Sequence, residues 1–196
     1  MEERWKKITA ERACDIIDAN DLDADSMELL HAEMRPESYI RELSEAKKWR
    51  DAVKVMTRAL PPREVVWWAC VCARQLKALS SDTSEIAALV AAEKWVNKPT
   101  DENRREAFRL AQESAAASAG TMCALAAAFS GGKLPVAENQ EIDLESSVFP
   151  DIVDAVVMTA AAEKPSEQID EQLQCFLASG KDIACGGNGR IEEDKG

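Results

Sequence analysis

The sequence has 196 residues, of which 46% are hydrophobic and 31% are charged, so its composition is that of a globular protein and not of a disordered chain. It carries 36 acidic and 24 basic residues, a net charge of −12, which argues against binding to nucleic acid or to an anionic membrane surface, because both depend on Lys and Arg. No apolar stretch approaches the length that spans a bilayer, and the first residues lack the apolar core of a secretory signal, so we expect a cytoplasmic protein.

Apolar residues recur with helical spacing through the first third of the chain. We predict a helix over residues 2–19, an acidic turn over 20–25 and a short helix over 26–34. A long helix should begin at Pro36, where the missing N–H costs nothing, and should reach residue 60. Pro61 and Pro62 end it, because a residue that precedes proline disfavours the α conformation.

Residues 63–74 are apolar on every side for more than two helical turns. A helix of this kind in a water-soluble protein must be surrounded by other elements. We therefore predict that this segment is the central helix of the fold, with Trp67 and Trp68 both in the core. The alternative is that one of these adjacent indoles lies in a partner's groove, since successive helical residues diverge by about 100°.

Cap residues divide the second half of the chain into further helices. Asp82 with Glu85 forms a capping-box pattern, Thr100 precedes two acidic residues, and residues 118–121 mark a break before an alanine-rich helix. Two glycines after Ser130 stop that helix. A long acidic loop is predicted over residues 131–149, a C-terminal helical pair over 150–180, and a disordered, glycine-rich and charged tail over 186–196.

These elements predict an all-α fold of about nine helices in antiparallel hairpins. Two architectures fit, an irregular bundle or a short solenoid of helical hairpins. We expect residues 1–180 to form a single helical domain, with a family-like core over residues 31–135.

The segment around the paired tryptophans resembles the signature of a bacterial helical protein family of unknown function. The shared pattern is Pro-x-Arg-Glu-x-Val-Trp-Trp, present here as Pro61-Pro62-Arg63-Glu64-Val65-Val66-Trp67-Trp68. The resemblance covers roughly residues 36–135 and leaves the cysteine-containing C-terminal quarter outside. It implies no activity; an association with secretion systems or toxin delivery would imply an adaptor, a chaperone or an inhibitor.

Two residue patterns resemble metal-binding motifs, and neither is complete. Asp21, Asp23 and Asp25 match the first three ligands of a calcium loop, but Ser26 stands where a glycine is needed and Ala32 where a bidentate glutamate is needed. The favoured interpretation is an acidic helix-capping turn. Cys70 and Cys72 would point about 200° apart on a helix, so they cannot share one ion, and buried thiols are expected.

No catalytic constellation is recognisable, and we predict no cofactor. The leading hypothesis is a non-enzymatic protein–protein interaction module, such as an adaptor, a chaperone-like helper or a toxin-neutralising protein, with Arg63, Glu64, Trp67, Trp68 and Arg74 as interaction candidates. A basic protein partner would suit the acidic surface. Two alternatives remain open: an enzyme whose site is assembled from dispersed side chains, and a structural subunit of a homo-oligomer.

Overall fold

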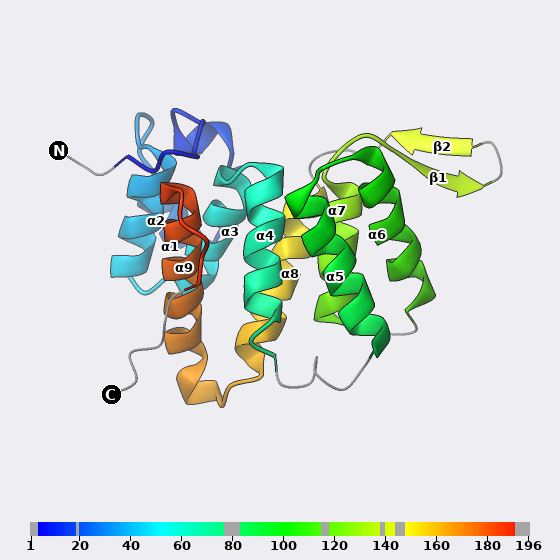
Figure 1. Ribbon diagram of the computed structural model, residues 1–196. Coiled ribbons are helices and arrows are strands. Elements are labelled where there is room, and N and C mark those ends of the chain that lie inside the picture. The colour runs from blue at the N-terminus through cyan, green and yellow to red at the C-terminus, as the bar shows by residue number, and fades with distance from the viewer. Residues whose placement is uncertain are drawn as a thin grey trace. The chain divides into compact units, whose positions relative to one another are not determined.

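The computed structural model describes residues 4–18, 20–76, 83–114, 118–137, 140–143 and 148–190, and for residues 134–143 only the backbone. Nine α-helices and one antiparallel pair of short strands lie within these ranges (Figure 1), so the predicted all-α class is confirmed. The chain divides into two compact units. The first comprises residues 1–61 and 161–196, and the second comprises residues 62–160. The prediction of one helical domain stays a prediction.

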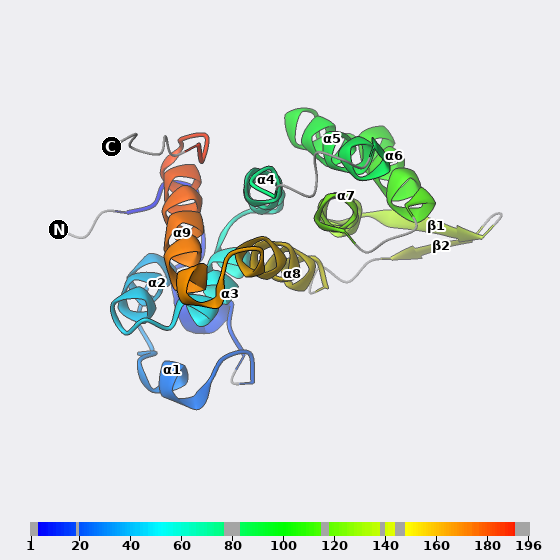
Figure 2. The same ribbon diagram turned by 90° about the horizontal axis from the view of Figure 1, so that it is seen from below.

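The first unit is built on α3 (Trp49–Ala59), which packs against both α2 (Pro36–Glu45) and α9 (Ile169–Cys185), as Figures 1 and 2 show. The short helices η1 (Ala13–Asp15) and α1 (Ala24–Glu28) precede them, and η3 (Ser166–Gln168) leads into α9. α3 is amphipathic, and it buries apolar residues at helical spacing together with residues of α2 and α9. The core side chains are Tyr39, Leu43, Val53, Met56, Leu173 and Phe176.

The predicted helix over residues 2–19 is wrong. Within the described residues of this segment, only Ala13–Asp15 form a short 3-10 helix. Trp5, Ile8 and Ile17 are nevertheless buried. Tertiary hydrogen bonds replace the helical ones, since Lys7 N–H donates to the Ala184 carbonyl at 2.9 Å and Ala13 N–H donates to the Met34 carbonyl at 2.7 Å.

The single helix predicted from residue 36 to 60 is also wrong, because it is interrupted at residues 46–48. Lys47 lies in the left-handed region with φ 59°. Its N–H donates to Ser44 O and the Lys48 N–H donates to Leu43 O, which is the hydrogen-bond pattern of a Schellman helix end. Glycine usually occupies a left-handed position at a helix end, but Lys47 stands here instead. The sequence therefore contains no marker that predicts the break.

A buried polar network joins α1, α2 and α3. The Ser26 hydroxyl donates to Asp51 Oδ2 at 2.5 Å, and the Tyr39 hydroxyl donates to the Ser26 carbonyl at 2.6 Å. Tyr39 is fully buried, so its phenolate would have to form without water. Burial, followed by the negative charge of Asp51, raises the pKa of Tyr39 to about 12.

Tyr39 is the only tyrosine in the chain, so its ionisation can be followed directly by absorbance near 295 nm. We expect the folded protein to titrate near pH 12, whereas the unfolded chain titrates near 10. Because the folded pKa is raised, the folded state should lose stability as pH rises above about 10. A Tyr39→Phe variant is the control, because it removes both the signal and this part of the pH dependence. A native titration near pH 10 would contradict the buried network.

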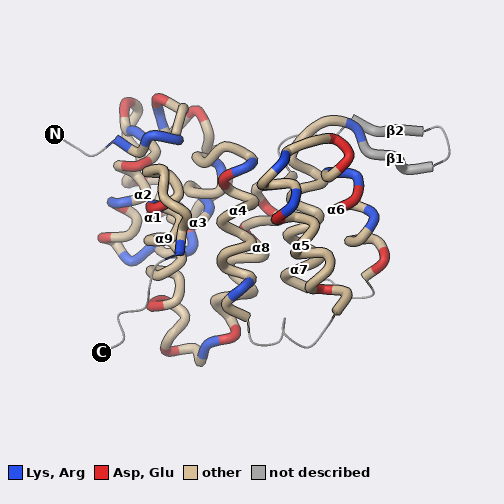
Figure 3. Tube along the Cα trace, in the orientation of Figure 1, with Lys and Arg blue, Asp and Glu red and all other residues tan. Residues whose placement is uncertain are grey.

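The second unit contains α4 (Pro62–Ala73), α5 (Thr83–Asn97), α6 (Asp101–Glu113), α7 (Ala119–Phe129) and most of α8 (Val148–Ala162). Helices α5, α6 and α7 pack on one another, and α4 packs on α5 and α7. Figure 3 shows charges along α6 and none along α7. Small side chains on α7 allow this close approach, and Ala124, Ala126, Ala127 and Ala128 are all fully buried.

The predicted cap at Thr100 is confirmed, because its side chain accepts from the Asn103 N–H at 3.3 Å. The break predicted over residues 118–121 differs from the structure: Ser118 accepts from the Thr121 N–H at 3.2 Å and caps α7, so residues 119–121 are helical. The predicted cap at Asp82 lies outside the described residues. The segment predicted as a loop over residues 131–149 differs from expectation, because β1 (Lys133–Ala137) pairs with β2 (Gln140–Asp143) as an irregular hairpin.

Helix α9 passes through Gly180, where we predicted its end, and stops at Gly186, which has φ 106°. The residues that follow fold back on the helix. Ser179 Oγ donates to the Gly189 carbonyl at 2.6 Å, and the Gly189 N–H donates to Asp182 Oδ2 at 2.8 Å. The beginning of the predicted disordered tail is therefore held by α9, and residues 191–196 lie outside the described residues. No helix among the described residues has the length and apolar character needed to cross a membrane.

Candidate functional site

The five predicted interaction residues all belong to α4 or follow it. Most of them make contacts within the second unit. Trp68 is fully buried, as predicted, whereas Trp67 is only partly buried. Arg74 forms a two-pronged ion pair with Glu93 of α5, at 2.8 and 2.7 Å. Arg63 donates to the Val96 carbonyl at 2.7 Å and also lies 3.4 Å from Glu64. Arg63 and Arg74 are therefore engaged in contacts within the second unit.

The three aspartates of the partial calcium pattern do not converge. Asp21 pairs with Arg58 at 3.5 Å and Asp25 pairs with Lys48 at 3.1 Å, while the Asp23 N–H donates to Asp51 at 3.4 Å. The acidic turn is therefore attached to residues in and beside α3. In the described part of the chain, no three His, Cys, Asp or Glu side chains are placed to hold a metal ion.

Cys70 and Cys72 are fully buried and unbridged. A hydrogen bond with Cys123, together with burial, raises the pKa of the Cys70 thiol well above its ordinary value. Burial does the same for Cys72. Both groups are thus held as neutral thiols, and a thiolate that could ligate a metal or attack a substrate is disfavoured.

A pocket of about 310 Å³ lies in the first unit, and sequence reasoning did not identify it. One face of α2 and one face of α9 line it, each contributing residues at i, i+3, i+4 and i+7 spacing, and Trp5 and Trp49 complete the wall. The lining residues are Trp5, Glu37, Ile40, Arg41, Ser44, Trp49, Gln174, Leu177, Ala178 and Lys181. Its size is at the lower end of the range of about 300–1,000 Å³ seen for ligand pockets.

Glu37 is the most unusual residue of this pocket. It is only 5% exposed, and its Oε1 accepts from Arg35 Nε at 2.8 Å. Its second oxygen, Oε2, is buried and has no hydrogen-bond partner within the described residues. Arg35 Nη2 is likewise buried without a partner among the described residues, so the Arg35–Glu37 pair uses only part of its hydrogen-bonding capacity.

The position of the pocket residues follows from local structure. Pro36 begins α2, which fixes Glu37 in the first turn, where the helix dipole favours a carboxylate. Trp49 begins α3 directly after the Lys47 turn. Trp5 is held beside α9 because the Lys7 N–H bonds to the Ala184 carbonyl. Three segments far apart in the sequence therefore meet at this pocket.

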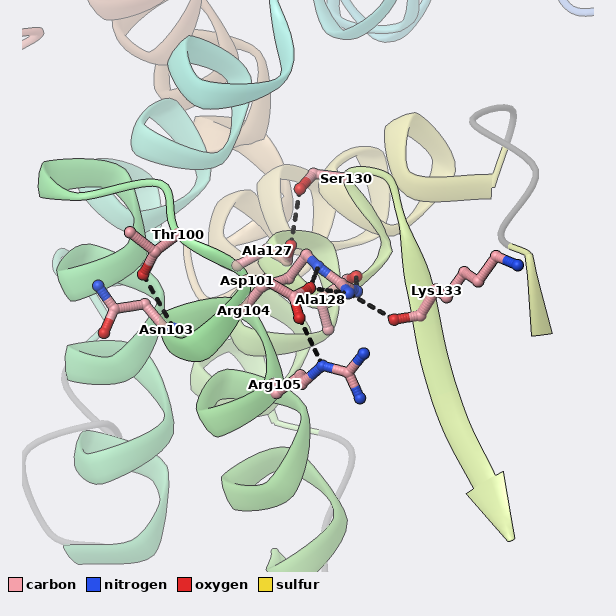
Figure 4. Close-up of polar contacts among 9 residues, drawn as sticks. All are labelled: Thr100, Asp101, Asn103, Arg104, Arg105, Ala127, Ala128, Ser130 and Lys133. Carbon is pink, nitrogen blue, oxygen red and sulfur yellow. Dashed lines mark hydrogen bonds and ion pairs between the residues drawn. The ribbon is translucent and has the colours of Figure 1, made fainter. Parts of the chain in front are cut away.

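Arg104 forms a second buried charged cluster, shown in Figure 4, whose role is structural. It is 5% exposed and donates from α6 to the Asp101 carboxylate, to the Ala128 carbonyl at 3.0 Å and to the Lys133 carbonyl at 2.5 Å. The cation thus lies against the C-terminal end of α7 and the start of β1. Gly132 leaves room for it, since a Cβ there would lie 3.2 Å from the guanidinium. Every nitrogen of Arg104 is used within the fold.

Comparison with known proteins gives a family but no activity. A model described as a family of unknown function (DUF6931) matches residues 39–184. The match extends well beyond the predicted range of residues 36–135, and it corrects the expectation that the C-terminal quarter lies outside the family. No curated protein and no solved structure matches the chain. The match covers most of the chain and includes α3 and most of α2, α9 and the pocket, and the chain therefore belongs to this family of unknown function.

Proposed function

We propose that the chain is a protein–protein interaction module that binds its partner at the pocket between α2 and α9. The observation that carries the proposal is the pocket itself, which has a volume of about 310 Å³ and has Trp5 and Trp49 in its wall. Interfaces concentrate their energy at such pockets, and tryptophan is enriched there.

The net negative charge of the chain favours a partner whose surface around the pocket is basic. The net charge of −12 would attract such a surface and speed its association. An adaptor, a chaperone-like helper and a toxin-neutralising protein all fit this mode of binding. The proposal moves the predicted interface from α4 to the first unit, because the side chains predicted on α4 are largely engaged in packing and ion pairs.

Filling the pocket should abolish partner binding without unfolding the protein. Ala178 lines the pocket from α9 and is solvent-exposed, so an Ala178→Trp side chain can occupy the cavity without entering the core. Immobilised wild-type and Ala178→Trp proteins should be compared for stoichiometric capture of a partner from a lysate of the source organism. We expect capture by the wild type and at least about a tenfold loss with the variant.

The matched control is Ala155→Trp, which places the same residue at an exposed position of α8 that is not part of the pocket lining. It should capture the partner as the wild type does. Equal capture by all three proteins would place the interface elsewhere. Self-association alone, measured by light scattering, would favour a homo-oligomer subunit over an interaction module.

A further inference from the structure

We infer that Lys47, at the turn between α2 and α3, belongs to the partner interface and binds a carboxylate of the partner beside the pocket. This inference rests on the proposed function and adds to it one residue and one chemical group of the partner. Three observations carry it. They are the left-handed backbone of Lys47, the lack of a polar partner for its side chain within the described residues, and its place between two residues of the pocket wall.

The backbone conformation of Lys47 is unfavourable for a lysine. With φ 59°, it is the only non-glycine residue with a positive φ in the part of the chain that the structure describes. A Cβ atom is crowded in this conformation, and glycine is the usual residue at such a helix end. The turn is formed by backbone hydrogen bonds, from Lys47 N–H to Ser44 O at 3.0 Å and from Lys48 N–H to Leu43 O at 2.8 Å. Glycine would form the same bonds with less strain, so the turn does not require the lysine side chain.

The Lys47 side chain has no polar partner that would explain it within the fold. It is exposed, and no carboxylate of the described ranges pairs with its ammonium group, including that of Glu45 two residues earlier. The next residue differs, because Lys48 Nζ lies 3.1 Å from Asp25 Oδ2 and links the turn to α1. Backbone strain that the fold does not need is found most often at functional positions.

The turn adjoins the pocket. Ser44 in the last turn of α2 and Trp49 at the start of α3 both line the pocket, and Lys47 stands between them in the chain. A partner that fills the pocket would cover surface beside these two residues, within reach of a long lysine side chain. An ammonium group has three N–H donors and a full charge, so its complement is a carboxylate. One such contact is compatible with a partner that is basic overall, because net charge steers association at long range.

A purely structural role for Lys47 predicts a different result. A cation near the C-terminal end of α2 would stabilise that helix through its dipole. If this were the only role of the lysine, its replacement would change stability and leave partner binding unaffected. Stability and binding must therefore be measured on the same variants.

The test compares wild type, Lys47→Gly, Lys47→Gln and Lys47→Arg, with the purified protein that the wild type captures as the probe. We expect Lys47→Gly to unfold at a higher urea concentration than the wild type, because glycine relieves the strain. It should nevertheless bind the probe at least about fivefold more weakly, as should Lys47→Gln, whereas Lys47→Arg should retain binding. Lys164→Gln is the matched control and should bind as the wild type does, since Lys164 is exposed in the first unit and outside the pocket lining.

A zero-length cross-link locates the contact directly. A carbodiimide joins an amine to a carboxylate in contact with it, so the wild-type complex should give an amide bond between Lys47 and an Asp or Glu of the partner, identified by mass spectrometry. Unchanged binding by Lys47→Gly, or cross-links that never include Lys47, would overturn the inference. If Ala178→Trp loses the partner while Lys47→Gly keeps it, the proposed function stands and the role of Lys47 falls. If the wild type captures no partner, both fall.

Discussion

An Arg104→Met variant should lower the free energy of unfolding by about 3 kcal/mol, because it removes the donor for two backbone carbonyls at a buried site. The Ala128 and Lys133 carbonyls would each lose their guanidinium partner, and methionine fills a similar volume without supplying an N–H. Arg104→Lys should recover only part of this loss, since an ammonium cannot reproduce the planar fork that reaches three groups. Urea denaturation followed by circular dichroism at 222 nm measures the change.

The neighbouring residue provides the control for this variant. Arg105 pairs with the same carboxylate, Asp101, at 2.6 Å, but its side chain is 37% exposed. Exposed ion pairs contribute about 0–1 kcal/mol, so Arg105→Met should cost less than about 1 kcal/mol. If the two variants were equally stable, the bonds from Arg104 to α7 and β1 would have no energetic role.

A Gly120→Ala variant should destabilise the protein by about 2–3 kcal/mol, although alanine is the better helix former. Gly120 lies in the first turn of α7, and a Cβ built there would be 2.4 Å from the backbone carbonyl oxygen of Glu85 in α5. A backbone atom cannot move aside as a flexible side chain can, so α5 and α7 would have to separate. Without this clash, the same substitution would stabilise the helix by up to about 1 kcal/mol.

The sign of the Gly120→Ala effect is therefore the informative result. Gly131→Ala is a useful comparison, because a Cβ at Gly131 meets nothing within 4 Å and its φ of 147° alone would cause strain. It should cost about 1 kcal/mol. A Gly120→Ala variant that was more stable than the wild type, by thermal or urea unfolding, would show that the two helices do not approach this closely.

The helices that were predicted correctly are those in which a local residue pattern agrees with the tertiary packing. The segment predicted as the central helix over residues 63–74 is α4, and seven of its 12 residues are buried. Thr100 begins a helix as its side chain predicts, and the glycines after Ser130 follow the end of α7. In each case the residue acts within one helical turn, so no distant contact is needed to interpret it.

The errors have physical causes that single-sequence patterns do not contain. Lys47 adopts a left-handed conformation that usually requires glycine, so the break between α2 and α3 had no marker. Gly180 continues a helix because its surroundings are buried, which overrides its low helix propensity. Trp5 and Ile8 are buried without a helix, because this segment makes hydrogen bonds to distant carbonyls instead.

The candidate site could not be found in the same way. Trp5, Glu37, Trp49 and Lys181 are widely separated in sequence and form no motif, and the first two lie outside the residues that match the family model. The single local sign was Glu37 directly after the helix-initiating Pro36, which is also the usual place for an ordinary dipole-stabilising acid. The pocket exists only in the folded structure, where residues of α2 and α9 both line it.

The most direct test of the account is to add the captured partner to the ¹⁵N-labelled chain and to record which indole N–H signals change. The five tryptophans are distributed over both units, with Trp5 and Trp49 at the pocket and Trp67, Trp68 and Trp95 in α4 and α5. We predict that the signals of Trp5 and Trp49 shift on binding and that those of α4 and α5 stay in place. Shifts confined to Trp67 and its neighbours, with the pocket indoles unchanged, would contradict the account.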